Sequence, residues 1–170
     1  MIAPPEKLIL LVCGGREFTD RQIVYRTLDA ITKDPGKDFP RPGLTVVHGG
    51  CPRGADKLAD DWCQDNGVNR IVFHARWNTE GRGAGIIRNG RMLDTMKPNV
   101  VLAFPGGNGT ANMVGRAKKA GYPVVVEIYD IPSEEQYQAL GPALFAAIKE
   151  YVHEWRKAQA QDQAHHLSRV

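Results

Sequence analysis

The sequence has 170 residues, of which 42% are hydrophobic and 24% are charged. This length and composition predict one globular domain with its own hydrophobic core, and they exclude a disordered chain and a membrane-bound one. The 22 basic and 19 acidic residues give a net charge of only +3, which disfavours a general nucleic-acid binder. Residues 70–97, however, hold six basic residues against two acidic ones, a local net charge of +4. This concentration predicts a local anion site rather than a basic surface.

The cysteines and the apolar runs indicate the cellular compartment. Cys13, Cys51 and Cys63 form no CxxC pair and no regular framework, and an odd number of such cysteines is typical of a reducing compartment. The apolar stretch Leu8–Cys13 is too short for a signal peptide. No run approaches the roughly 20 apolar residues that a membrane-spanning helix needs. We therefore predict a cytoplasmic protein with no membrane partner.

Alternating apolar runs and helical patterns predict the fold. The near-continuously apolar runs, typical of strands buried on both faces of a parallel sheet, are Leu8–Cys13, Leu44–His48, a weaker one at Arg70–Phe73, Val100–Phe104 and Val124–Ile128. The first helical pattern begins after a cap at Thr19 or Asp20. The other helical patterns cover Ala55–Asn66, Gly85–Met96 and Thr110–Ala120. Strands that alternate with helices predict a Rossmann-like, doubly wound and mainly parallel α/β sheet with helices on both faces.

After Pro132 the pattern becomes helical. Residues 133–156 carry an apolar stripe that includes Leu144, Ile148 and Trp155, whereas residues 157–170 are expected to form a frayed tail. We predict a single domain over residues 1–156, with its core at residues 7–128. The stripe either packs on that core or forms an interface with a second copy, and the sequence leaves both options open.

Three predicted strands end in glycine-rich turns that lead into helices. These turns are Gly14-Gly15-Arg16, Gly49-Gly50-Cys51-Pro52-Arg53-Gly54 and Pro105-Gly106-Gly107-Asn108-Gly109-Thr110. The carboxyl ends of parallel strands meet at one edge, where glycine lets backbone N–H groups approach a ligand and a helix N-terminus adds positive potential. A single turn of this kind is weak evidence, but three at one edge predict a phosphate-binding pocket. The absence of GxxxxGK[ST] and of GxGxxG disfavours the P-loop and classical dinucleotide-binding classes.

The basic stretch supplies further candidate ligands. Arg88 and Asn89 follow a glycine-rich turn, and the Arg88 guanidinium is suited to bidentate phosphate contacts, so we assign both to the site. Arg91 shares a helix face with Arg88, and Trp77 could stack on a base. For Arg91 and Trp77 a packing role explains the pattern equally well. His48 and His74 fall at strand ends without a second ligand at a recognisable spacing, so we predict no metal and no cofactor.

These motifs also resemble a known family. Residues 105–110 resemble the PGGxGT motif of the SLOG superfamily, which includes the "lonely guy" phosphoribohydrolases and the DNA-processing protein Smf/DprA. With the motifs at residues 13–18, 48–56 and 88–92, the chain is similar to the YspA, YpsA-related branch over residues 7–128. The resemblance implies a Rossmann-like fold, a pocket for a nucleotide or nucleotide-derived ligand, and phosphate contacts from Gly106, Gly107, Gly109 and Thr110. It also leaves a homo-oligomer open.

One departure from the family bears on catalysis. In the phosphoribohydrolases, acidic residues stand two and three positions after the threonine, whereas this chain has Asn112 and Met113 there. Cleavage of an N-glycosidic bond passes through a cation-like state that a carboxylate stabilises. The resemblance therefore supports binding and leaves enzymatic activity undecided. Asp56, Asp94 and Glu17 are the candidate replacement carboxylates. Asp56 is the best placed of them, although an acidic residue at a helix start is equally explained by the helix dipole.

We therefore predict a module that senses or sequesters a nucleotide or a related phosphorylated small molecule. Hydrolysis of the N-glycosidic bond of a nucleoside monophosphate is the second hypothesis. Single-stranded DNA binding is the third, because the chain offers only one basic segment that could bind DNA. The candidate ligand-binding residues are Gly14, Gly15, Arg16, Gly49, Gly50, Arg53, Gly54, Trp77, Arg88, Asn89, Pro105, Gly106, Gly107, Gly109 and Thr110.

Overall fold

The computed structural model describes residues 7–32 and 43–126. The chain divides into two compact units, Met1–Ile131 and Pro132–Val170, and every described residue belongs to the first. The predicted helices at 133–156, the tail at 157–170 and the last part of the strand expected at Val124–Ile128 lie outside the described residues. Those expectations therefore stay predictions.

The described residues form one five-stranded parallel sheet of order β3-β2-β1-β4-β5. The strands are β1 (Leu8–Cys13), β2 (Leu44–His48), β3 (Asn69–Val72), β4 (Val100–Ala103) and β5 (Val124–Val125). This arrangement confirms the predicted Rossmann-like α/β fold. Because β1 lies between β2 and β4, the strand order reverses beside β1, and ligands of open α/β sheets bind at such a point.

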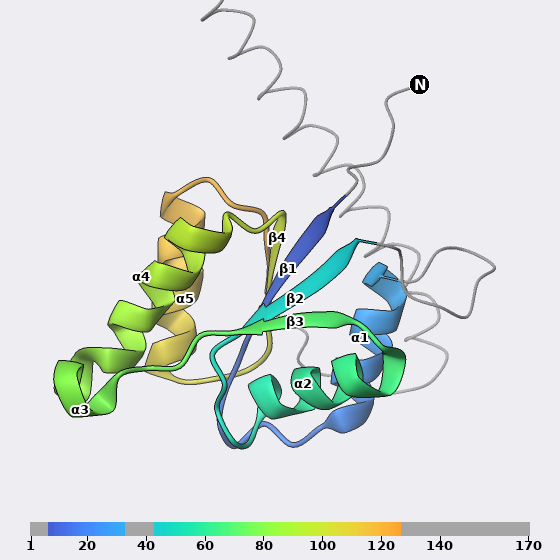
Figure 1. Ribbon diagram of the computed structural model, residues 1–170, viewed down its shortest axis with the longest axis horizontal. Helices are drawn as coiled ribbons and strands as arrows, with labels where there is room; N and C mark the ends of the chain where they lie inside the picture. Colours follow the sequence, from blue (N-terminus) through green and yellow to red (C-terminus); the bar gives the residue numbers. More distant parts are fainter. Residues whose placement is uncertain (1–6, 33–42, 127–170) are drawn as a thin grey trace, which may run out of the picture. The chain divides into compact units, whose positions relative to one another are not determined.

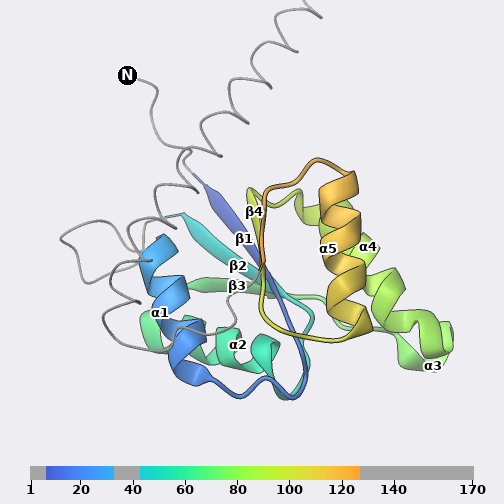
Figure 2. The ribbon, with the colours of Figure 1, turned by 180° about the vertical axis from the view of Figure 1, so that it is seen from behind.

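Helices cover both faces of this sheet, as Figures 1 and 2 show from opposite sides. They are α1 (Arg21–Thr32), α2 (Ala55–Asn66), α3 (Trp77–Glu80), a 3₁₀ turn η1 (Gly81–Gly83), α4 (Ala84–Met96) and α5 (Asn108–Lys119). The helices α1 and α2 lie on one face, and α4 and α5 lie together on the other. Of the two predicted caps of α1, Asp20 is the one that acts: its Oδ1 accepts the Ile23 N–H at 3.0 Å. Gly67 ends α2 at φ 64°.

The core forms because successive strand residues point to opposite faces. The cluster under α4 and α5 consists of Leu11, Cys13, Val47, Met92, Leu93, Val101, Ala103, Met113 and Ala117. On α2, the fully buried Trp62 donates from Nε1 to Asp29 Oδ1 at 2.8 Å. Ile86, in the first turn of α4, is an apolar residue that stays 43% exposed.

The loop after β1 holds the other two glycine-rich loops against it. The Gly15 N–H donates to the Pro105 carbonyl at 2.9 Å, and the Gly15 carbonyl accepts the Ala55 N–H at 3.2 Å. Gly14 permits this approach, because a Cβ atom there would lie 2.5 Å from the Ala55 Cβ and 2.9 Å from the Phe104 Cβ. The three loops are therefore fixed to one another through backbone groups.

A Gly14→Ala substitution tests this packing. We expect it to lower the free energy of unfolding by about 1–3 kcal/mol, because the added methyl group overpacks the junction. Gly115→Ala on α5 is the matched control: its Cβ would meet open space, and alanine favours the helix by roughly 1 kcal/mol. Denaturant unfolding measures both. A Gly14→Ala protein as stable as wild type would contradict the packing role.

Candidate functional site

A cavity of about 990 Å³ lies beyond the carboxyl ends of β1, β2 and β4. Its walls come from residues 12–17 at the end of β1 and in the loop after it, 49–53 after β2, the segment between β3 and α4, the helix α4, and 107–110 at the start of α5. The structure brings these predicted site residues to one cavity: Gly14, Gly15, Arg16, Gly49, Gly50, Arg53, Trp77, Arg88, Asn89, Gly107, Gly109 and Thr110. Their part in ligand binding stays a prediction.

Three predicted residues do not line the cavity and lie instead between the loops. Gly54 adopts φ 77° and faces the Gly15 carbonyl, so a side chain there would collide with backbone. The Pro105 carbonyl accepts the Gly15 N–H, and Gly106 lies against the Thr110 side chain. These residues shape the loops, and their part in ligand binding stays a prediction.

The start of α5 presents unpaired backbone donors to the cavity. No side chain caps the helix at Gly107, and the first helical bond runs from the Ala111 N–H to the Gly107 carbonyl at 3.0 Å. Among the described residues, none accepts a hydrogen bond from the N–H groups of Asn108, Gly109 or Thr110. A Cβ atom at Gly107 or Gly109 would have no neighbour within 4 Å. The end of this helix is therefore open to an anion.

Asn89 holds this open end in place. Its side chain is buried, and Nδ2 donates to the Gly109 carbonyl at 3.0 Å and to Asn112 Oδ1 at 3.3 Å. Asn112 Oδ1 also accepts a hydrogen bond from Arg116 Nε at 3.2 Å. The side chains of Asn89 on α4 and of Asn112 and Arg116 on α5 therefore form one hydrogen-bonded chain. Asn89 thus positions the α5 loop as well as lining the cavity.

Arg88 supports the second loop and keeps part of its guanidinium group free. Nη1 donates to the carbonyls of Gly49 and Phe73, the latter at 3.2 Å, while Nε is buried without a partner. No described residue accepts a hydrogen bond from Nη2. Burial lowers the pKa of Arg88, which nevertheless stays a cation at neutral pH. This arginine therefore gives the cavity a charged donor that is already held in place.

Asp56 is the buried carboxylate of the cavity wall and is only 6% exposed. Its Oδ2 accepts the Cys51 N–H at 3.2 Å. Burial raises the pKa of Asp56, whereas this hydrogen bond and the charge of Arg88 oppose the rise. Burial raises the pKa of the nearby Cys13 thiol to about 12, and this residue belongs to the hydrophobic core cluster.

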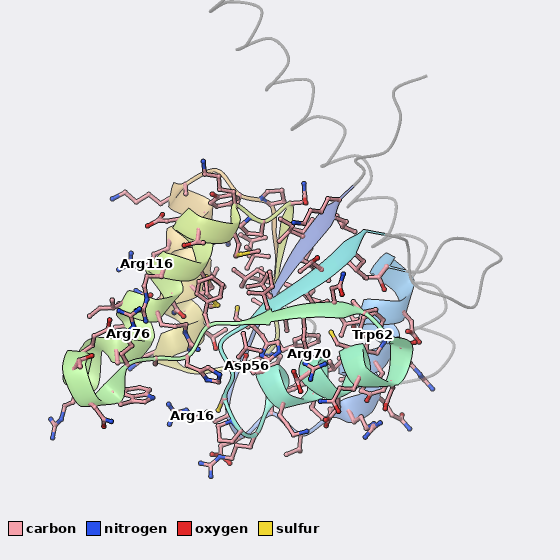
Figure 3. All side chains as sticks on the ribbon, in the orientation of Figure 1. Arg16, Asp56, Trp62, Arg70, Arg76 and Arg116 are labelled. Carbon is pink, nitrogen blue, oxygen red and sulfur yellow. The ribbon has the colours of Figure 1, made fainter. Side chains whose placement is uncertain are left out.

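Arg16, Arg53 and Trp77 are exposed residues of the cavity wall, and we call the part that they form the mouth of the cavity. The Arg16 guanidinium lies 5.7 Å from the centre of the Trp77 ring, which is 50% exposed, and Arg53 pairs with Glu17 at 2.7 Å. Figure 3 labels Arg16 and Asp56 at the end of the sheet where this cavity lies. Arg91 is outside the cavity wall and pairs with Glu80 at 3.2 Å, so its packing role is the one the structure supports.

Sequence reasoning passed over several residues of the cavity wall. Arg82, Ile86 and His74 line it together with Asn108. Arg82 stands inside the glycine-rich segment 81–85, and Asn108 lies inside the third turn, so both were adjacent to recognised motifs. For His74 and Ile86 the sequence contained no indication that they line a cavity, because their place depends on the path of the chain between β3 and α4.

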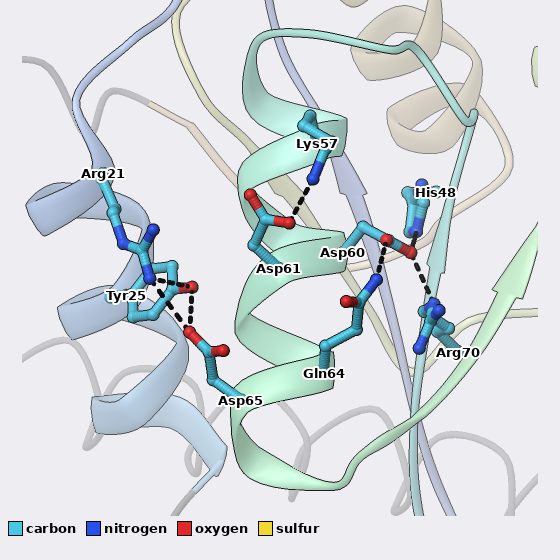
Figure 4. A network of polar contacts seen from close by, with 9 residues as sticks. All are labelled: Arg21, Tyr25, His48, Lys57, Asp60, Asp61, Gln64, Asp65 and Arg70. Atoms are coloured by element: carbon cyan, nitrogen blue, oxygen red, sulfur yellow. Dashed lines mark hydrogen bonds and ion pairs between the residues drawn. The ribbon is translucent and has the colours of Figure 1, made fainter.

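A chain of polar contacts begins at His48, at the end of β2, and continues through Asp60 to Arg70, as Figure 4 shows. The Gly50 N–H donates to His48 Nδ1 at 3.2 Å, so Nδ1 is unprotonated, and Nε2 donates to Asp60 Oδ1 at 3.1 Å. Asp60 Oδ1 also pairs with Arg70 Nε at 2.6 Å. Burial lowers the pKa of His48, which keeps the ring neutral and in this tautomer. The chain fixes Gly50, which lines the cavity.

The structure also bears on the other sequence expectations. Met113, at one of the positions that are acidic in the phosphoribohydrolases, is fully buried in the core, and Asn112 bonds to Asn89 and Arg116. Over residues 7–32 and 43–126, no group of three or more His, Cys, Asp or Glu side chains is placed to hold a metal ion. No helix in this described part of the chain has the length and apolar character to cross a membrane.

The sheet order and the cavity at its switch point define a Rossmann-like α/β protein with a glycine-lined pocket. The sequence pattern of the YspA, cpYpsA-related SLOG family matches residues 8–79, so the predicted SLOG resemblance is confirmed there. That match spans β1 to the start of α3 and ends before Arg88 and the α5 loop. The roles of those later residues therefore depend on their geometry. No curated protein matches the chain in sequence.

Solved structures share the fold. The Moco carrier protein of Chlamydomonas reinhardtii is 20% identical and has a TM-score of 0.54, over 87% of this chain and 99% of that one. The molybdenum cofactor binding protein of the phototrophic bacterium Rippkaea orientalis is 23% identical with a TM-score of 0.55, over 82% of this chain and 87% of that one. At these identities the comparison establishes the common fold.

Two substitutions of His48 test whether it positions Gly50. In His48→Asn an amide oxygen lies near the place of Nδ1, whereas in His48→Gln the amide reaches toward Asp60 and leaves the Gly50 N–H without an acceptor. We expect hydrogen exchange of the Gly50 amide to be at least about fivefold faster in the Gln variant than in wild type, and close to wild type in the Asn variant. Equal exchange in both variants would contradict the assignment. Amide exchange followed by NMR measures it.

Proposed function

We propose that this protein binds a nucleotide or a nucleotide-derived phosphorylated ligand in the cavity beyond β1, β2 and β4. The observation that carries the proposal is the start of α5, where the N–H groups of Asn108, Gly109 and Thr110 have no partner among the described residues. These donors lie on the positive end of a helix of 12 residues and face the same cavity as Arg88. A phosphate group satisfies backbone donors and charge together.

The charges around the cavity support an anionic ligand. Four arginines line it, namely Arg16, Arg53, Arg82 and Arg88, against the two carboxylates of Glu17 and Asp56. Arg88 needs little further ordering to bind an anion, because two backbone carbonyls already hold its Nη1. At the mouth, Trp77 offers an exposed aromatic face for a planar ring. A volume of about 990 Å³ accommodates a ligand with both a ring and phosphate groups.

The comparisons supply a second candidate ligand. The neighbours of this fold from Chlamydomonas reinhardtii and Rippkaea orientalis are a carrier and a binding protein of the molybdenum cofactor. We include that cofactor as an alternative occupant of the same cavity. Both candidates make the protein a binding module that holds a small molecule. A cytoplasmic location and a homo-oligomeric state stay predictions of the sequence.

Hydrolysis of a nucleotide is a separate question from binding. The acidic positions that follow the threonine in the phosphoribohydrolases are Asn112 and Met113 here, and neither supplies a carboxylate. Asp56 is the buried one of the two carboxylates that line the cavity, so it is the candidate on which cleavage of an N-glycosidic bond would depend. Free base and ribose phosphate released from a bound nucleoside monophosphate, and not released by Asp56→Asn, would establish such an activity.

A thermal-shift panel tests the binding proposal. The ligands are nucleoside mono-, di- and triphosphates, cyclic dinucleotides, ADP-ribose and, as a separate arm, the molybdenum cofactor. A ligand at 100 times its Kd adds about 2.7 kcal/mol of stability, which raises the Tm of a chain of this size by roughly 5–10 °C. We expect a selective rise with one class of ligand. A flat panel would contradict the proposal.

Gly107→Val provides the decisive variant for that panel. Gly107 has φ −90° and no atom within 4 Å of its built Cβ, so valine fits the backbone and projects into open space beside the α5 donors. We expect unfolding free energy within about 1 kcal/mol of wild type and loss of the ligand-induced shift. Gly115→Val, in the same helix and outside the cavity wall, is the control that retains the shift. Retained binding by Gly107→Val would exclude the α5 loop as the phosphate site.

A further inference from the structure

Asp56 and Arg88 carry opposite charges in one cavity and do not form an ion pair with each other. Both side chains line the cavity wall, and each influences the pKa of the other through its charge. The ion pairs of the described residues nevertheless include no bond between them. A buried carboxylate and a buried guanidinium usually pair directly, because each loses its hydration. Neither charge is therefore neutralised by a direct bond to the other.

The bonding capacity of Asp56 is only partly used. Its carboxylate accepts the backbone N–H group of Cys51. A carboxylate offers about four acceptor positions, so roughly three remain. No side chain among the described residues donates to them. A group that binds Asp56 in the cavity must therefore carry its own proton donor.

Arg88 is placed in the complementary way. Its Nη1 is committed to the carbonyls of Gly49 and Phe73, and these bonds fix the plane of the guanidinium group. Its Nη2 has no acceptor among the described residues. The same cavity thus presents an unused acceptor at Asp56 and an unused donor at Arg88.

We propose that Asp56 and Arg88 bind a hydroxyl group of the ligand whose phosphate occupies the start of α5, an inference that rests on the proposed function. A hydroxyl group donates its proton to the Asp56 carboxylate and accepts from Arg88 Nη2 through the same oxygen. A phosphate dianion has no proton to donate, and the Asp56 charge repels it. The phosphate is therefore directed to the α5 donors. The ligand class is a phosphorylated sugar, such as the pentose phosphate part of a nucleotide.

A matched pair of small probes tests this assignment by NMR titration. Ribose 5-phosphate carries the hydroxyl groups, and tetrahydrofurfuryl phosphate has the same ring and phosphate without them. Inorganic phosphate reports on the α5 site alone. We expect wild type to bind ribose 5-phosphate at least about tenfold more tightly than tetrahydrofurfuryl phosphate, because a hydrogen bond to a charged group is lost in the second probe.

Asp56→Asn should abolish that preference while inorganic phosphate binds at least as tightly as to wild type. The amide keeps the shape of the carboxylate, and its remaining oxygen can still accept a loop N–H. Glu17→Gln is the matched control, because Glu17 also lines the cavity but is exposed and paired with Arg53. We expect it to retain the preference. The Tm of each variant separates a folding defect from a binding defect.

The other outcomes have distinct meanings. If inorganic phosphate binds wild type but the two sugar-like probes bind equally, the hydroxyl assignment is wrong and the α5 site stands. Equal losses for all three probes in Asp56→Asn would show that Asp56 only braces residues 49–51, which also overturns the inference. If none of the probes binds wild type, the proposed function fails first, and the hydroxyl assignment fails with it.

Discussion

The structure depends on the close approach of three loops at Gly14 and Gly15. The Gly15 N–H and carbonyl bond to Pro105 and Ala55, so the loop after β1 fixes both the loop that leads into α5 and the start of α2. This approach is possible because neither glycine has a side chain at the junction. The consequence is that two helix N-termini and the end of β1 surround one cavity. The cavity is thus a product of backbone packing, and its geometry is fixed before a ligand arrives.

Charged side chains inside this cavity are stabilised by the backbone and not by one another. Arg88 bonds to two carbonyls, and Asp56 accepts the Cys51 N–H of the neighbouring loop. Burial opposes both charges, lowering the pKa of Arg88 and raising that of Asp56. Such an arrangement costs stability that a direct ion pair would partly restore. It is the arrangement expected of a site in which a ligand completes the bonding, since binding then satisfies the groups that folding leaves open.

Much of the fold could be predicted from the sequence, but the sequence did not show which glycines pack against other loops and which face the cavity. The strands Leu8–Cys13 and Leu44–His48 were predicted residue for residue, because their near-continuous apolar character leaves no alternative to a doubly buried strand. By contrast, Gly14 packs against other loops while Gly107 faces open space, although both stand in glycine pairs that follow strands. Only the tertiary neighbours distinguish them. The bracing role of Arg88 was equally hidden, because its carbonyl partners are 39 and 15 residues away.

The central claim is that the free N–H groups at the start of α5 bind phosphate. The most direct measurement is an NMR titration with inorganic phosphate at constant ionic strength, following the backbone amides of Asn108, Gly109 and Thr110. These resonances are predicted to move together along one saturable curve. The amide of Ile23, already bonded to Asp20 at the start of α1, is predicted to stay unchanged. Equal shifts at both helix starts, or no saturable shift at α5, would contradict the account.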